Sequence, residues 1–458
     1  MELDEKQEEK YRHLTGDPVE GLVCRLAVPS MVSMLVTAFY NMADTFFVGM
    51  LRNNSATGAV GVVFSLMAII QAVGFFFGHG SGNFISRELG KQHMEEAENM
   101  AATGFFSALA AGILICLLGQ LFLTPLATLL GSTPTILPYS REYLRIILFG
   151  APWMTASLVL NNQLRFQGSA AYAMVGITSG AVLNIALDPI MIFWMDLGVA
   201  GAAWATIISQ FISFCLLLAG CARGGNLRIH ISKVQLKPAY YVMIVKGGLP
   251  SLGRQGLASV ATICLNQAAG PYGDTAIAAM GIVQRITMFG GSAMIGFGQG
   301  FQPVCGFNYG AGLYSRVKKG FWFCVKTSTC FLFAVGLLGI AFAPQLIALF
   351  QDDPEVISYG AAALRFQCAT FFFQGWIVMS NMMLQTIGKT VPATFVAMAR
   401  QGIFFIPMVF ILSNTLGFLG VQITQSVSDL LTLICAIPIQ LYIMRRMGSD
   451  VKVASPAD

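Results

Sequence analysis

Apolar stretches of about twenty residues or more follow one another along almost the entire chain, separated by short polar segments. A helix of about 20 apolar residues crosses the roughly 30 Å hydrocarbon core of a bilayer. Of the 458 residues, 55% are apolar and only 11% are charged, whereas roughly a quarter of the residues in a soluble domain are charged. These features predict an all-α polytopic membrane protein and argue against a soluble globular protein.

Glycine, proline and charged residues divide the apolar stretches into twelve predicted transmembrane spans. In chain order these spans are 22–48, 57–83, 101–124, 143–164, 171–194, 199–220, 241–269, 276–304, 321–349, 360–386, 391–413 and 418–443. The charged segment 1–21 lacks the short apolar core and cleavage site of a signal peptide, so we interpret it as an N-terminal tail.

The second half of the sequence repeats the first at a separation of about 220 residues. Matched pairs include Gly78 and Gly298, Gly80 and Gly300, Asn161 and Asn381, Gly168 and Gly388, Pro29 and Pro250, and Gly201 and Gly420. Each copy has six spans, an even number, so both copies enter the membrane from the same side and must be parallel repeats. The predicted fold is therefore twelve transmembrane helices in two parallel six-helix repeats. Such a duplication favours a substrate site between the repeats, near the membrane midplane.

Basic residues set the expected orientation. Of the 27 lysines and arginines, 19 fall on one predicted side of the membrane, from Lys6 to Lys452, whereas the opposite loops hold only Arg52 and Arg141. Because basic loops face the cytoplasm, we expect both termini to be cytoplasmic in a plasma or inner membrane. The predicted organisation is a cytoplasmic tail (1–21), a first lobe (22–220), a cytoplasmic linker (221–240), a second lobe (241–443) and a cytoplasmic tail (444–458).

Three carboxylates lie within predicted spans, and two of them are in the first half. A charge at the bilayer centre costs roughly 2.5–3.5 kcal/mol, so each needs a partner, a proton or water. Asp188 follows Asn184 by four residues, which places both on one helical face. Together with Asp44 they offer hard oxygen ligands suited to Na⁺. The same two carboxylates held close together would instead retain a proton, and a purely structural hydrogen-bonding role is the third interpretation.

Charged residues inside the predicted transmembrane spans of the second half are mainly basic. Arg254, Arg285 and Arg400 lie within predicted helices, and Asp429 is the accompanying carboxylate. We expect these arginines either to pair with Asp429 or backbone carbonyls or to contact substrate. Both interpretations remain open from the sequence.

Motifs for nucleotide or soluble-type chemistry are missing. Gly388-Lys389-Thr390 resembles the end of a phosphate-binding loop, but Met383 stands where the first glycine belongs. The four histidines and ten cysteines form no metal-ligand spacing. We therefore expect no enzymatic activity, no cofactor and no nucleic-acid partner, and we expect energy to come from an ion gradient, Na⁺ or H⁺.

The stretches LAVPSMVSMLVTAFYNMADTFFVG, GSGNFISRELG, NNQLRFQG and AVLNIALDP resemble the multidrug and toxic compound extrusion (MATE) family, in particular its DinF/MepA-type branch. The resemblance extends from about residue 15 to 445. It implies the MATE-type fold of two lobes, alternating access, and antiport of organic cations against Na⁺ or H⁺. It also implies a monomer in contact with membrane lipid.

Position by position, the family's cation-coupling residues correspond to Asp44, Asn184, Asp188 and Thr206, and its helix-bending proline corresponds to Pro29. The three arginines of the second lobe are not an obvious lining for a cation pocket. An anionic or zwitterionic substrate is thus the alternative, including a flippase for a lipid-linked precursor.

Overall fold

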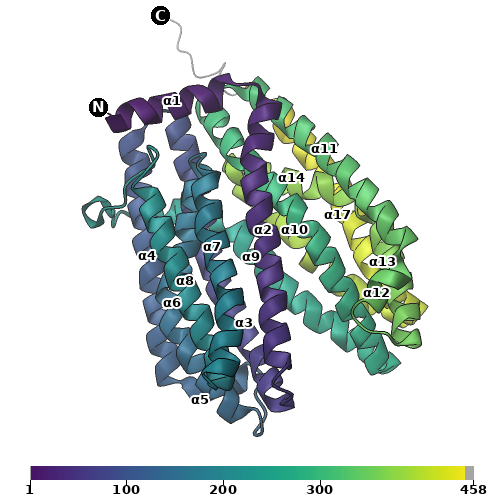
Figure 1. The fold of residues 1–458 in the computed structure, drawn as a ribbon. Coiled ribbons are helices and arrows are strands. Elements are labelled where there is room, and N and C mark those ends of the chain that lie inside the picture. Colours follow the sequence, from purple (N-terminus) through teal and green to yellow (C-terminus); the bar gives the residue numbers. More distant parts are fainter. Residues whose placement is uncertain (1, 449–458) are drawn as a thin grey trace, which may run out of the picture. The chain divides into compact units, whose positions relative to one another are not determined.

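The computed structural model describes residues 2–448, and every regular element in this range is helical (Figure 1). The elements of the first half are α1 (Glu2–Gly16), α2 (Val19–Gly49), α3 (Asn54–Gly90), α4 (Met94–Leu121), α5 (Leu123–Leu129), α6 (Leu137–Phe166), α7 (Ala170–Pro189), η1 (Ile190–Trp194) and α8 (Gly198–Cys221). Those of the second half are η2 (Ile231–Lys233), α9 (Pro238–Ala269), η3 (Gly270–Tyr272), α10 (Asp274–Gly310), α11 (Tyr314–Ala341), α12 (Ala343–Ala348), α13 (Pro354–Thr370), α14 (Phe373–Thr386), α15 (Thr390–Met398), η4 (Ala399–Ile403), α16 (Phe405–Leu416) and α17 (Phe418–Arg446).

Each of the twelve predicted spans coincides with one long helix or with consecutive helical segments. Within the described part of the chain, nine of these spans are long and apolar enough to cross a membrane. The pair α13–α14, which bends by 58° at its break, is a tenth if it is taken as one span. The remaining two, α9 and α10, carry Arg254 and Arg285 within the helix. Lys452 and the end of the predicted C-terminal tail lie outside the described residues.

The helices form two compact units. Unit 1 contains the chain up to Gly16 and then Val28–Gly248, and unit 2 contains Asp17–Ala27 and the chain from Leu249 onward. The chain changes unit within α2, immediately before Pro29, and again within α9, immediately before Pro250. The first helix of each repeat therefore begins in one unit and ends in the other. The predicted linker, 221–240, lies within unit 1.

The repeat is visible in the backbone of equivalent turns. After α3, the Lys91, Gln92 and His93 amides donate to the Arg87, Leu89 and Glu88 carbonyls, and the matching turn after α10 repeats this pattern. Gly168 and Gly388 follow α6 and α14 with φ of 81° and 84°. These are the left-handed turns that satisfy the last carbonyls of a helix.

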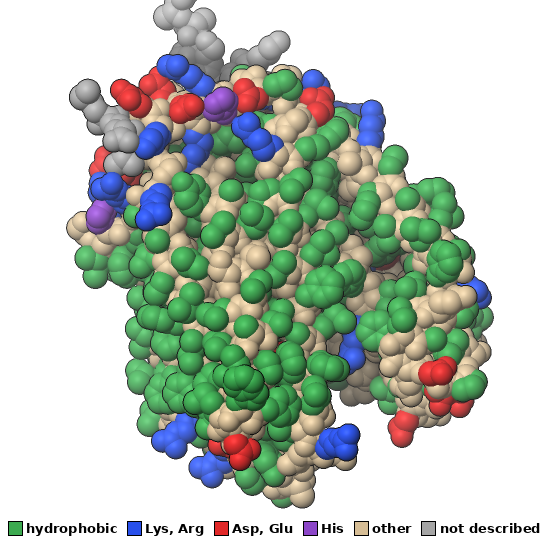
Figure 2. Space-filling view, viewed as in Figure 1, with side chains coloured by type: hydrophobic (Ala, Val, Ile, Leu, Met, Phe, Trp, Pro, Cys, Tyr) green, Lys and Arg blue, Asp and Glu red, His purple; other side chains and the backbone are tan. Residues whose placement is uncertain are grey.

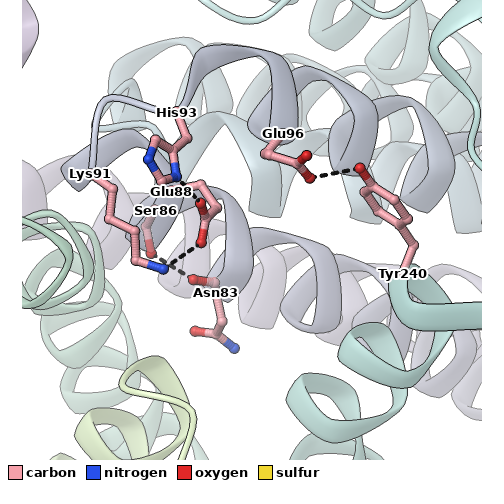
Figure 3. Close-up of polar contacts among 7 residues, drawn as sticks. All are labelled: Asn83, Ser86, Glu88, Lys91, His93, Glu96 and Tyr240. Atoms are coloured by element: carbon pink, nitrogen blue, oxygen red, sulfur yellow. Dashed lines mark hydrogen bonds and ion pairs between the residues drawn. The ribbon is translucent and has the colours of Figure 1, made fainter. Parts of the chain in front are cut away.

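Side chains at these equivalent turns differ between the units. At the end of α3 the buried Glu88 carboxylate accepts bonds from Lys91 Nζ, at 2.8 Å, and His93 Nδ1, at 2.9 Å (Figure 3). Glu96, on the following helix, accepts a 2.7 Å bond from Tyr240 Oη in α9. In unit 2 the matching position is Asn308, whose Oδ1 accepts from Arg316 Nε at 2.8 Å.

Unit 1 is a bundle in which α6 contacts α3, α4, α7 and α8. Glycines allow close helix contact: a methyl group at Gly82 would lie 2.2 Å from the Phe166 ring, and one at Gly80 would lie 2.3 Å from the Ile244 carbonyl oxygen in α9. Such small-residue contacts are typical of helix packing in lipid. Hydrophobic side chains cover the middle of these helices and charged ones lie at their ends (Figure 2), as expected for spans in a bilayer.

Unit 2 has its own apolar core, formed by α9, α10, α12, α13, α16 and α17 around Phe405, Leu364 and Ile347. A methyl group at Gly300 of α10 would lie 2.4 Å from the Ala27 Cα. The first residues of α2 thus pack on α10, just as the first residues of α9 pack on α3. In both repeats, the first helix thus begins by packing against a helix of the other repeat.

Helix α1 attaches to unit 1 through Lys10 and Leu14. The Lys10 ammonium donates to Ser169 Oγ and to Asn226 Oδ1, both at 2.8 Å. Leu14 is 3% exposed and packs beside Gly168. Burial among neutral groups lowers the pKa of Lys10 from its ordinary 10.5 to about 8, because desolvation disfavours the charged form.

Candidate functional site

Two carboxyl groups, from Asp44 in α2 and Asp188 in α7, face each other inside unit 1 and interact directly. Asp188 is fully buried. Asp44 Oδ1 and Asp188 Oδ2 are buried and have no hydrogen-bond partner within the described residues. The interactions of this pair include no lysine or arginine. Two such groups repel each other when both are ionised, so the arrangement favours a bound cation or a single shared proton.

Asn184 supports Asp188 from the preceding turn of α7. Its Nδ2 donates to Asp188 Oδ1 at 3.2 Å, whereas its own Oδ1 is buried and has no partner in the part of the chain that the structure describes. The sequence predicted this shared face from the four-residue spacing. The amide thus contributes a free oxygen beside the carboxyl pair.

Helix α7 ends irregularly just after these residues. Pro189 has no N–H, so the Ile185 carbonyl lacks its usual helical donor. The chain then continues as the π-helical turn η1, in which the Met195 amide bonds the Ile190 carbonyl at 2.9 Å. Single π-helical turns of this kind are frequent at functional sites.

Thr206, in α8, lies at the same cluster. It is 1% exposed, and its hydroxyl donates to the Ala202 carbonyl at 3.0 Å, which leaves the oxygen lone pairs able to accept. The Tyr143 hydroxyl of α6 interacts with Thr206, and Tyr143 also interacts electrostatically with Asp44 and Asp188. The structure therefore brings together all four residues that the family resemblance selects.

Sequence reasoning missed three members of the cluster. Tyr143 is 1% exposed and Tyr40, in α2, is 6% exposed; Tyr40 interacts with Gln210 of α8 and with both carboxyl groups. A tyrosine in an apolar span resembles ordinary core filling, so it carried no signal. Gln210 follows Thr206 by one helical turn, which was the one available hint.

In unit 2 the in-span carboxylate is paired with a base. Arg400 lies in the π-helical turn η4, and its Nε donates to Asp429 Oδ1 at 2.8 Å. Gln425 Nε2 donates to the same oxygen at 2.9 Å. Asp429 is 1% exposed. Of the three second-half arginines, only this one meets a carboxylate among the residues that the structure describes.

The other two arginines and the predicted bending proline lie apart from this pair. Arg254 Nη1 donates to Asn381 Oδ1 at a long 3.4 Å, whereas the exposed Arg285 side chain has no polar partner in residues 2–448. Pro29 lies inside α2, two residues after Ala27, where the helix passes from unit 2 to unit 1. No group of three or more His, Cys, Asp or Glu side chains suited to a metal ion occurs in the described chain.

A sequence model of the MatE family matches the chain twice, over residues 29–190 and again over 250–411. The chain belongs to the MatE family. The two matches begin 221 residues apart and have equal length, which agrees with the internal repeat. The predicted family and the twelve-helix fold are therefore confirmed.

Relatives of this MatE chain extend over nearly its full length. Multidrug export protein MepA from Staphylococcus haemolyticus is 27% identical over 447 residues, covering 97% of this chain and 98% of the relative. The MepA protein of Staphylococcus aureus strain MSSA476 is 26% identical with the same coverage. A solved structure of a multidrug resistance MATE family transporter, in an outward-facing conformation, is 26% identical with a TM-score of 0.89, covering 96% of this chain and 98% of that chain. The chain is thus a multi-pass membrane transporter of a multidrug export family, and not an enzyme.

Proposed function

We propose that this MatE transporter exports amphipathic organic compounds, organic cations among them, in exchange for Na⁺ or H⁺. Asp44, Asn184, Asp188 and Thr206 form the coupling site in this proposal, with the two carboxyl groups as the charged ligands. The observation that carries it is the pair of facing carboxyl groups inside an apolar bundle, which meets no basic side chain among residues 2–448. A cation or a proton stabilises such a pair, and its departure destabilises it.

Exchange then follows from linkage. An ion that binds one conformation of the transporter more tightly than another shifts the population toward that conformation. A substrate with the opposite preference is released as the ion binds, and the coupling free energy is the same in both directions. We assign the conformational change to alternating access of the two units, with bending of α2 at Pro29, where the helix passes between them. A plasma or inner membrane location with both termini cytoplasmic completes the proposal, because the basic side of each repeat then faces the cytoplasm.

Efflux of ethidium from proteoliposomes, under separately imposed Na⁺ and pH gradients, tests this function. We expect wild type to respond to at least one gradient and Asp188→Asn to lose that response. Asp274→Asn is the matched control, because it removes an exposed carboxylate from the first turn of α10. Gradient-driven efflux that survives in both Asp44→Asn and Asp188→Asn would refute the proposed coupling site.

A further inference from the structure

We infer that unit 2 contains a binding subsite for an anionic group of the substrate, a carboxylate or a phosphate, formed by Arg400 and Arg254. This inference deepens the proposed export of organic compounds by naming a substrate class: amphipathic molecules, zwitterions included, that carry such a group.

Arg400 is held from one side only. Its Nε bonds the Asp429 carboxylate, and neither of its Nη atoms has a hydrogen-bond partner within residues 2–448. The side chain is 24% exposed, whereas Asp429 is 2% exposed. The two Nη groups are the forked end that binds a carboxylate or phosphate with two parallel hydrogen bonds. Asp429 therefore orients Arg400 and leaves this end available.

The backbone around Arg400 is fixed by the same helix that carries Asp429. In η4 the Phe404 amide bonds the Ala399 carbonyl at 3.0 Å, so the Arg400 carbonyl loses its ordinary helical partner. Ser428 Oγ of α17 donates to that carbonyl at 2.6 Å. Side chains of α17 thus hold Arg400 through both its backbone and its guanidinium. Preorganisation of this kind reduces the ordering cost of binding.

Arg254 supplies a second, uncompensated charge. Its Nη1 donates to the neutral Asn381 side-chain amide at 3.4 Å, and no carboxylate pairs with it in the described chain. Asn381 is itself held by a 2.7 Å bond from its Nδ2 to the Ala393 carbonyl. An arginine within a membrane span is costly unless a partner or water satisfies it. An anionic ligand is such a partner.

Helix packing places Arg254 and Arg400 at a similar height along two neighbouring helical segments of unit 2. A methyl group at Gly253 would lie 2.9 Å from Met398 Cγ, and one at Gly402 would lie 2.3 Å from Leu257 Cδ1. Helix α9 is therefore in close contact with the end of α15, just before Arg400, and with η4, just after it. Two arginines and one carboxylate leave a net positive charge at this level.

A matched dye pair tests the subsite: rhodamine B, which has a free carboxylate, and its ethyl ester, which has none. Binding to the purified full-length protein is measured by fluorescence polarisation, without an ion gradient. We expect wild type to bind the acid more tightly than the ester. Arg400→Gln and Arg254→Gln should each weaken acid binding about tenfold and leave ester binding unchanged, because each removes a charged hydrogen-bond donor.

Two further variants keep the test decisive. Arg400→Gln combined with Asp429→Asn removes the donor fork without leaving a buried carboxylate unpaired, and it should lose the acid preference equally. Arg365→Gln, an exposed arginine of α13, should retain it. An acid-to-ester ratio unchanged in the Arg400 and Arg254 variants would overturn the inference.

The source of the anionic group is tested by competition with short-chain phosphatidylglycerol. If phosphatidylglycerol displaces rhodamine B only at lipid concentrations well above the Kd of rhodamine B, the result supports an organic solute as the source of the anionic group. Displacement below that concentration would assign the subsite to a lipid phosphate and overturn the proposed substrate class. Because binding needs no gradient, Asp188→Asn should keep the acid preference, so failure of the antiport proposal and failure of this one are distinguishable.

Discussion

The two units repeat one architecture but distribute charge in opposite ways. Gly201 and Gly420 match at a separation of 219 residues, and the same separation relates Thr206 to Gln425 and Gln210 to Asp429. In unit 1 the Asp44–Asp188 pair meets no lysine or arginine among residues 2–448, whereas in unit 2 the Asp429 carboxylate pairs with Arg400 on a neighbouring element. In unit 2, Pro407 occupies the position of Asp188 by this match.

Duplication has preserved the helix packing of the two units, whereas their polar positions have diverged. The glycine turns after α6 and α14 and the close glycine contacts are kept in both units because the backbone requires them. A carboxyl pair without a counter-charge is suited to an ion that comes and goes. An ion pair that is permanently satisfied is suited to holding a binding group in place.

Replacing an acid by its amide should change the free energy of unfolding in opposite directions in the two units. Asp429→Asn leaves Arg400 without its counter-ion and should destabilise the protein by about 2–3 kcal/mol, a value reduced from the full buried-pair cost because Arg400 is partly exposed. Asp188→Asn removes repulsion and an unsatisfied buried oxygen, so it should stabilise by about 1 kcal/mol. Denaturation midpoints of the purified protein, measured without Na⁺ at neutral pH, decide this. Equal signs for the two variants would contradict the comparison.

The sequence predicted the features that depend on local pattern. Apolar length identified the spans, glycine and proline spacing identified the repeat, and the interval between Asn184 and Asp188 placed both side chains on one face. Resemblance to the family selected Asp44 and Thr206. Their proximity in the structure agrees with that selection, and their role in coupling stays a prediction.

Features that depend on tertiary packing could not be predicted. The transfer of α2 and α9 between units follows from contacts at Gly300 and Gly80, which no local pattern records. Tyr40 and Tyr143 join the carboxyl pair only because α2, α6 and α7 meet there. The sequence left open whether Arg400 pairs with Asp429 or a backbone carbonyl or instead contacts substrate, and its bond to Asp429 is visible only in the folded structure.

A smaller effect, on the affinity for the coupling ion, should distinguish a change at Thr206 in α8 from one at the matched residue of α17. Thr206→Val removes one neutral oxygen beside the carboxyl pair and should weaken apparent affinity for the coupling ion about fivefold, equivalent to about 1 kcal/mol. Gln425→Leu, the matching change in unit 2, should leave ion affinity unchanged because Gln425 donates to the Asp429 carboxylate, which is already paired with Arg400. The ion concentration that gives half-maximal efflux measures both. A larger shift in the unit 2 variant would show that the coupling site does not lie in unit 1.

The smallest effect concerns the attachment of α1, which belongs to unit 1 alone. The docked helix lowers the pKa of Lys10 to about 8 from its usual 10.5, so the charged lysine opposes docking and the neutral lysine does not. The cost is fully present below about pH 8 and disappears as the pH rises toward 10.5, so docking should strengthen steadily across that window. A spin label at Glu5→Cys should become less mobile over this range. Lys10→Met should abolish the pH response, while Arg12→Gln, an exposed change on the same helix, should keep it. A label whose mobility is constant in wild type, or rises with pH, would show that the charge on Lys10 does not oppose docking of α1 on this unit.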